Sequence, residues 1–333
     1  MTRMELKALV TMIRHSVFSL VHVPDNDGRQ IRISGRPQSE RRANLASIAE
    51  RFAARRDGLN RFEDDWRKMA DHWAGWDPKA LDNRRRALLV TNSYADAAVV
   101  ADALAAALDA GGFAGWKVHC LVRDRDEGGA RDDNGLSRAR AMPRSLVERF
   151  GLEPDPSILV APLSVIARGH NILNTEGKAA ISGIYFLHRP HPRPDDLGPT
   201  IGRLNRYAQE RYDRGVSTTD GESFAQRARR VRHAASRIVR YGLEAGRSGY
   251  RSLPAEFKAQ FAWDMLTPLW QTIGRGIRGG CPVHIGFVDY AFAPRSFEAD
   301  ATPDTPDSSV LVQSLRQLEQ ALEVLGIGVP DRM

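Results

Sequence analysis

Residues 271–278 contain side chains whose types and spacing could act on a phosphate group. The run is Gln271-Thr-Ile-Gly274-Arg275-Gly-Ile-Arg278, and it follows an apolar helical stretch. Two arginines three residues apart share one face if the helix continues through them. A planar guanidinium binds two phosphate oxygens at once and stabilises the charge that develops in phosphoryl transfer. A solvated basic helix end would explain either arginine alone, but not the whole arrangement.

The same run resembles motif VI of superfamily 2 helicases, Q-x-x-G-R-x-x-R, at all four defined positions. The resemblance implies that Arg275 and Arg278 contact the γ-phosphate of an ATP held mainly by a second RecA-like domain. Arg278 is then the expected arginine finger, and Gln271 couples the nucleotide to the cleft. Gly274 allows close backbone approach and is counted with the ATP-binding residues.

A second resemblance precedes it, since residues 158–172 are similar to helicase motif V. The core Ala167-Arg168-Gly169-His170-Asn171-Ile172 corresponds to A-R-G-x-D-I, with Asn171 in place of the acidic residue. An amide can still hydrogen-bond a ribose hydroxyl, so Gly169 and Asn171 are expected to contact ATP. Ser164 and Arg168 are expected to contact nucleic acid. A routine turn at a strand end would explain this segment equally well.

A third, less specific segment is Ala87-Leu-Leu-Val-Thr91-Asn92-Ser93-Tyr94, which resembles motif IV. The resemblance implies that Thr91, Asn92 and Ser93 contact the sugar–phosphate backbone. The three segments occur in the order IV, V, VI. Residues 186–196 are similar to the proline-rich turn of DinG/XPD-type helicases, and His188 and His191 within them are expected to be loop residues. Nucleic-acid contacts are also expected from the arginine-rich segment that follows, through Arg227, Arg230 and Arg237.

Hydrophobic periodicity predicts an α/β fold, with a RecA-like, doubly wound parallel sheet. Apolar runs typical of buried strands occur at 87–90, 117–122, 157–161, 181–187 and 283–288. We expect a helical accessory region over 1–83 and the RecA-like helicase C-terminal domain over 84–295. A helical insertion is expected at 199–250, and a linker with a C-terminal helix at 296–333.

A self-sufficient helicase needs a P-loop and an acidic magnesium motif, and the sequence contains neither. We therefore expect ATP and Mg²⁺ to be shared with a P-loop RecA-like domain. That domain would come from a separate protein, or from a longer parent gene of which this chain is a separated part. ATP hydrolysis is expected only in that pair. Cys120 and Cys281 are too few for a zinc site or an iron–sulfur cluster, and both are expected in the core.

The net charge of +7 favours a polyanionic partner, and we expect nucleic acid, with DNA favoured over RNA. The excess is mostly arginine, which genomic base composition could also produce. No apolar run is long enough to cross a membrane and no signal peptide is recognised, so a cytoplasmic location is expected. Two alternatives stay open. One is a non-catalytic nucleic-acid-binding or scaffold protein that keeps the RecA-like fold, and the other is a structural subunit whose basic face binds an acidic protein.

Overall fold

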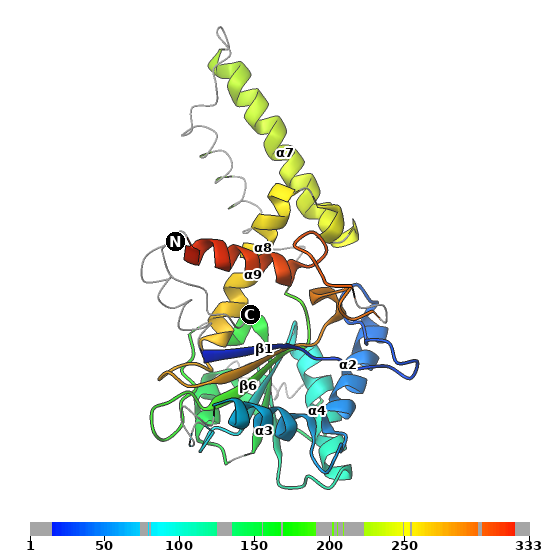
Figure 1. Ribbon diagram of the computed structural model, residues 1–333, viewed down its shortest axis with the longest axis vertical. Helices are drawn as coiled ribbons and strands as arrows, with labels where there is room; N and C mark the ends of the chain where they lie inside the picture. The colour runs from blue at the N-terminus through cyan, green and yellow to red at the C-terminus, as the bar shows by residue number, and fades with distance from the viewer. Residues whose placement is uncertain are drawn as a thin grey trace.

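The fold is built on one seven-stranded, all-parallel sheet in the order β1-β7-β6-β2-β5-β3-β4 (Figure 1). The computed structural model describes residues 15–73, 79, 81–124, 135–154, 156–167, 169–190, 202, 205, 209, 223–248, 250–253, 255–298 and 302–323. The strands are β1 (Ser16–Leu20), β2 (Arg86–Thr91), β3 (Lys117–Val122), β4 (Arg140–Pro143), β5 (Ser157–Pro162), β6 (Ile181–Phe186) and β7 (Val283–Phe287).

Continuous apolar runs form the central strands because both faces of the sheet are covered. Every residue of β2, β5 and β6 is buried. Side chains alternate between two cores: Leu88 and Val90 of β2 lie in one, and Ala87 and Leu89 lie in the other. These strands fall where the sequence predicted them.

Each face carries its own layer of helices. The first face, here called the α4 face, is covered by α2 (Gln38–Ala53), α3 (Arg61–Trp73) and α4 (Tyr94–Ala110). The opposite face, the α8 face, is covered by the 3₁₀ helix η1 (Arg144–Leu152), α5 (Leu163–Ile166), α8 (Ala255–Ile273) and α9 (Val310–Glu323). Two short 3₁₀ helices, η2 (Tyr250–Ser252) and η3 (Tyr290–Phe292), lie in the connections.

The order of the strands makes the sheet doubly wound. The connections from β1 to β2 and from β2 to β3 advance toward β4 and carry their helices on the α4 face. Those from β4 to β5, β5 to β6 and β6 to β7 run toward β1 and carry theirs on the α8 face. Both sets therefore cross over with one hand, as parallel strands require. The predicted α/β fold with a doubly wound parallel sheet is confirmed, and it is the arrangement expected of a RecA-like domain.

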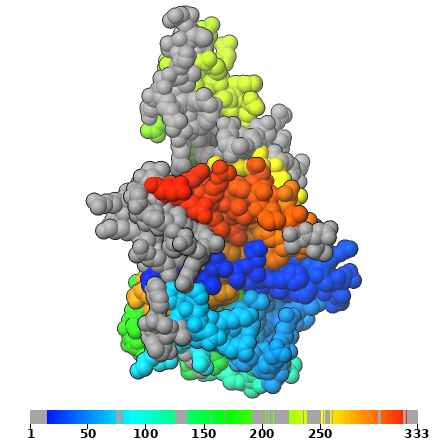
Figure 2. Space-filling view, viewed as in Figure 1, coloured from blue at the N-terminus to red at the C-terminus, as the bar shows by residue number. Residues whose placement is uncertain are grey.

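The two ends of the chain contribute more to this body than the sequence suggested. Region 1–83 was expected to be helical, yet its residues 16–20 form β1, which pairs in parallel with β7. Within 296–333, α9 packs on α8, where Gln317 Nε2 donates to the Ala259 carbonyl at 2.8 Å. Figure 2 shows α9, in orange and red, lying across the molecule above the blue N-terminal residues.

The expected insertion at 199–250 includes one long helix, α7 (Phe224–Ser248). Figure 1 shows α7 extending away from the sheet, beyond α8 and α9. Its sequence has seven arginines and one acidic residue, Glu244. The helix therefore presents a strongly basic extension of the otherwise layered body.

Candidate functional site

Three segments are here called motif IV, motif V and motif VI after the helicase motifs that they resemble. The motif VI residues form a turn, not a continuation of the helix. α8 ends at Ile273, and residues 274–280 form consecutive turns beside the amino ends of β6 and β7. Arg275 and Gly276 donate their backbone N–H groups to Thr272 and Ile273, three residues back, which tightens the chain. The prediction that both arginines share one helical face is wrong. The turn packs tightly at Gly276, where a Cβ atom would lie 2.5 Å from Val283 Cγ2.

Arg275 connects this turn to the motif V loop. Its Nη1 donates to the His170 carbonyl at 2.5 Å and its Nη2 to the Ala167 carbonyl at 3.0 Å. The side chain is buried, and burial together with the nearby charge of Arg278 lowers the pKa of the Arg275 guanidinium. Arg275 therefore holds two protein carbonyls here, and it fixes the position of the motif V loop relative to motif VI.

Arg278 is half-buried and follows Arg275 in the same turn. Its carbonyl accepts a hydrogen bond from Ala179 N at 3.0 Å, immediately before β6, so its backbone position is fixed. The positive charge of Arg278 contributes to the lowered pKa of Arg275, after the larger effect of burial.

The other residues expected to contact ATP surround this turn. Gln271 is exposed at the end of α8, and Gly274 is partly exposed. Gly169 is exposed and has a φ of +76°, which a glycine adopts without strain. Asn171 is exposed too, and its backbone N–H donates to Glu148 Oε1 at 2.6 Å.

Arg84 is a positioning residue that the sequence analysis missed. It is 1% exposed. Its guanidinium donates to four carbonyls at the amino ends of the central strands, those of Ala179, Ile181, Gly276 and Pro282. One buried side chain therefore ties β2 to β6, β7 and the motif VI turn.

A cavity of about 230 Å³ lies at the same amino edge of the sheet. Gly279 and Gly280, which directly follow Arg278, form part of its wall. Basic side chains from three separate segments also line it, those of Lys79, Arg84 and Lys178. Two acidic side chains, those of Asp82 and Glu176, line it as well, and Lys178 Nζ lies 3.5 Å from Glu176 Oε2, so the cavity is of mixed charge.

The motif IV residues lie at the opposite, carboxyl edge of the sheet. Thr91 is fully buried and donates its hydroxyl to the Ser93 carbonyl at 3.1 Å. Ser93 caps α4, its Oγ accepting from Asp96 N at 3.1 Å. Thr91 pairs with Pro162, directly before α5, so Asn92 and Ser164 follow neighbouring strand ends. Both residues are exposed, whereas Ser93 is partly exposed and Thr91 is buried.

The sequence analysis did not identify an aromatic and basic group at this carboxyl edge. Tyr94, the first residue of α4, carries the Arg123 guanidinium over its ring at 5.3 Å from the centroid. Burial raises the pKa of the Tyr94 phenol, while the charges of Arg144 and Arg123 oppose that rise. An aromatic ring flanked by exposed arginines is a typical contact surface for nucleotide bases and phosphates.

The remaining predicted contacts lie on α7 or outside the described residues. Arg230 and Arg237 are exposed on α7, and Arg227 is partly buried. Arg168 and His191 lie outside the described residues. His188 was expected in a loop at the surface, but it is 3% exposed and its Nε2 lies 3.8 Å from Asp96 Oδ2. Cys120 and Cys281 are buried as expected, and burial raises the pKa of the Cys120 thiol to about 12.

Comparison with known protein families and with curated proteins finds no match to this chain. The class that the structure itself shows is an α/β protein with a doubly wound parallel sheet. Within the residues that the structure describes, none of the helices is both long and apolar enough to cross a membrane.

Proposed function

We propose that this chain is the second motor half of a superfamily 2 helicase or nucleic-acid-dependent ATPase. The observation that carries the proposal is the pair of hydrogen bonds from Arg275 to the Ala167 and His170 carbonyls. They join the segments that resemble motifs V and VI, which lie more than a hundred residues apart in the sequence. Arg278 is the proposed arginine finger, and Arg275 is proposed as the residue that positions it and the motif V loop.

The separation of the two groups of residues supports this division of roles. Residues 274–280 lie beside the amino ends of β6 and β7, whereas Asn92, Ser164 and Tyr94 lie at the carboxyl edge. The amino edge is assigned to ATP and Mg²⁺ held mainly by a P-loop domain on a separate protein. The carboxyl edge is assigned to a single strand of nucleic acid, with DNA favoured.

The test uses the full chain together with its P-loop partner. The tagged chain is purified from its native cells, a co-purifying protein with a P-loop is identified, and the DNA-stimulated ATPase of the reconstituted pair is measured. We expect Arg278→Ala to lower kcat by about 10³-fold or more without releasing the partner, the effect typical of an arginine finger. Arg316→Ala, an exposed arginine on α9, is the control. Full activity in Arg278→Ala overturns the proposal.

A non-catalytic nucleic-acid-binding protein is the second candidate, and the basic α7 favours it. Binding of a labelled single-stranded oligonucleotide is measured at several salt concentrations for the chain alone. Replacing Arg227, Arg230 and Arg237 by alanine should weaken binding and flatten the salt dependence, by roughly 0.7 in the slope of log K per lost contact. If this happens while Arg278→Ala leaves the ATPase of the pair unchanged, the second candidate replaces the first.

A further inference from the structure

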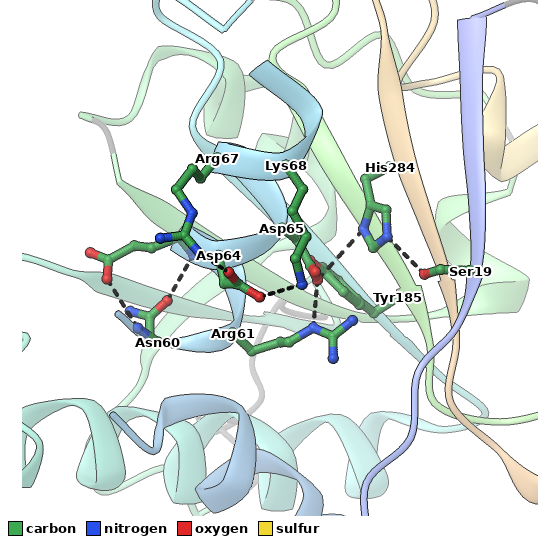
Figure 3. A network of polar contacts seen from close by, with 10 residues as sticks. Ser19, Asn60, Arg61, Asp64, Asp65, Arg67, Lys68, Tyr185 and His284 are labelled. Atoms are coloured by element: carbon green, nitrogen blue, oxygen red, sulfur yellow. Dashed lines mark hydrogen bonds and ion pairs between the residues drawn. The ribbon is translucent and has the colours of Figure 1, made fainter. Parts of the chain in front are cut away.

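A hydroxyl, an imidazole and a carboxylate follow one another in space on the α4 face of the sheet. Ser19 Oγ of β1 is 2.8 Å from His284 Nε2 of β7, and His284 Nδ1 is 3.7 Å from Asp65 Oδ2 of α3. Figure 3 shows His284 between the other two side chains. This is the order of groups that activates a serine nucleophile, although no local sequence motif marks it.

Two further donors fix the Asp65 carboxylate. Arg61 Nε donates to Asp65 Oδ2 at 2.7 Å, and the Tyr185 hydroxyl donates to the same oxygen at 2.8 Å. Burial and the charge of Asp65 raise the pKa of the Tyr185 phenol, so it remains a donor. Asp65 is itself 3% exposed. The carboxylate is therefore held facing the imidazole and cannot turn toward water.

The state of His284 suits a general base. Burial lowers its pKa, against the charge of Asp65 and with the help of Arg61 and Lys68, so the ring is neutral at pH 7. Its Nδ1 is buried and makes no hydrogen bond within the described part of the chain, and the Asp65 carboxylate is the acceptor that faces it. A carboxylate there favours the proton on Nδ1. Nε2 is then free to accept the proton of the Ser19 hydroxyl.

Exposure increases along the series in the direction that a nucleophile requires. Asp65 and His284 are buried, whereas Ser19 is partly exposed and is followed by Leu20, which is 40% exposed. Among the described strands, β1 lies at the edge of the sheet and pairs only with β7. The base and the carboxylate that orients it are therefore buried, and Ser19 is the most exposed of the three residues.

We propose that Ser19 is an activated nucleophile that takes an acyl group from a carboxylic ester, with His284 as its base and Asp65 as the orienting carboxylate. Ser19 Oγ attacks the carbonyl carbon and its proton moves to His284 Nε2. The bond from the carbonyl carbon to the alcohol oxygen breaks, and the alcohol leaves with that proton. Water then attacks the acyl-serine with His284 again as base, which releases the carboxylic acid and restores Ser19. This activity is independent of the proposed motor function.

The probe is a reporter-tagged alkyl fluorophosphonate, which forms a phosphorus–oxygen bond to an activated serine as fluoride leaves. The full-length folded chain is labelled and the modified residue is located by peptide mass spectrometry. We expect labelling at Ser19, lost on heat denaturation and absent in Ser19→Ala. We also expect hydrolysis of p-nitrophenyl acetate, used as the ester, to fall to the background rate in Ser19→Ala.

His284→Gln should slow labelling about 100-fold or more, the lower range for loss of a general base. Two variants serve as controls that should label like the wild type. Ser16→Ala changes another serine of β1. His119→Gln changes another buried histidine, on β3, whose Nε2 lies 3.5 Å from the Glu153 carboxylate. Labelling at Ser19 that is no faster than at other serines overturns the proposal, and so does labelling that persists in a folded His284→Gln variant.

The pH profile of wild-type labelling tests whether His284 is the base for Ser19, even if His284→Gln fails to fold. Asp65, Arg61 and Lys68 of α3, Tyr185 of β6 and Ser19 of β1 are the groups that act on His284. The labelling rate should rise as His284 loses its proton below pH 6.5 and then stay level. A rate that increases in proportion to hydroxide up to pH 9, with no plateau, indicates an ordinary serine and overturns the proposal.

Discussion

Replacing Arg84 by methionine should destabilise the protein strongly, although Arg84 comes from a run of three arginines that looks like a surface feature. Its guanidinium donates to the carbonyls of Ala179, Ile181, Gly276 and Pro282. Nε supplies one N–H group and Nη2 supplies two, which three of the carbonyls share. At about 1.5 kcal/mol per N–H group, the low end for a charged donor, they contribute about 4.5 kcal/mol. Removing the cost of burying the charge offsets part of this, so the expected net loss is about 3 kcal/mol in the free energy of unfolding.

The adjacent residue supplies a matched control. Arg85 is exposed, so Arg85→Met should change the free energy of unfolding by no more than about 0.5 kcal/mol. Urea denaturation gives the midpoint and the slope for both variants. Amide hydrogen exchange adds a local measurement, because loss of Arg84 should raise exchange at residues 179–181 and 276–283. Equal midpoints for the two variants, or unchanged exchange in those segments, would refute the view that Arg84 fastens the motif VI turn.

Two further predictions concern packing and pH. Gly276→Ala should lower the free energy of unfolding, measured by urea denaturation, by about 1–3 kcal/mol, since its Cβ would lie 2.5 Å from Val283 Cγ2. Gly274→Ala is the control, because its Cβ would lie 3.4 Å from its nearest neighbours. Equal losses of stability in the two variants would contradict the reasoning. Burial lowers the pKa of His188 and His284 below 6.5, so the unfolded chain binds protons first. Stability is therefore full above about pH 6.5 and falls as the pH drops toward 5, by roughly 1.4 kcal/mol per pH unit per histidine at most. His284→Gln should remove the contribution of one histidine to the fall of the free energy of unfolding with pH. The same pH dependence in the variant and the wild type would contradict this prediction.

Most of the sheet could be predicted because its strands are apolar runs long enough to be recognised locally. β1 could not be, since Ser16-Val-Phe-Ser-Leu20 is short and half polar. Its status as a strand comes from pairing with β7, from which it is separated by more than 260 residues. The hydrogen bond between Ser19 and His284 depends on that pairing and was equally inaccessible to sequence reasoning.

The candidate site was predicted in its residue types more than in its geometry. The spacing of Arg275 and Arg278 indicated a shared helical face, but close packing of Gly276 against Val283 accompanies a turn instead. Thr91 and Ser93 were expected to contact nucleic acid, and this stays a prediction; the structure adds that the Thr91 hydroxyl donates to the Ser93 carbonyl and that Ser93 Oγ accepts from Asp96 N. Arg84 was not singled out from the sequence, because all four carbonyls that it binds come from segments distant in sequence.

The connection from β5 to β6 has a mechanical consequence. It begins with α5 at the carboxyl edge of the sheet and ends at Ala180, beside the amino edge. Arg275 holds the Ala167 and His170 carbonyls of that connection, and the Arg278 carbonyl is bonded to Ala179 near its other end. Any displacement of the turn 274–280 would therefore be transmitted to a connection that runs from one edge of the sheet to the other.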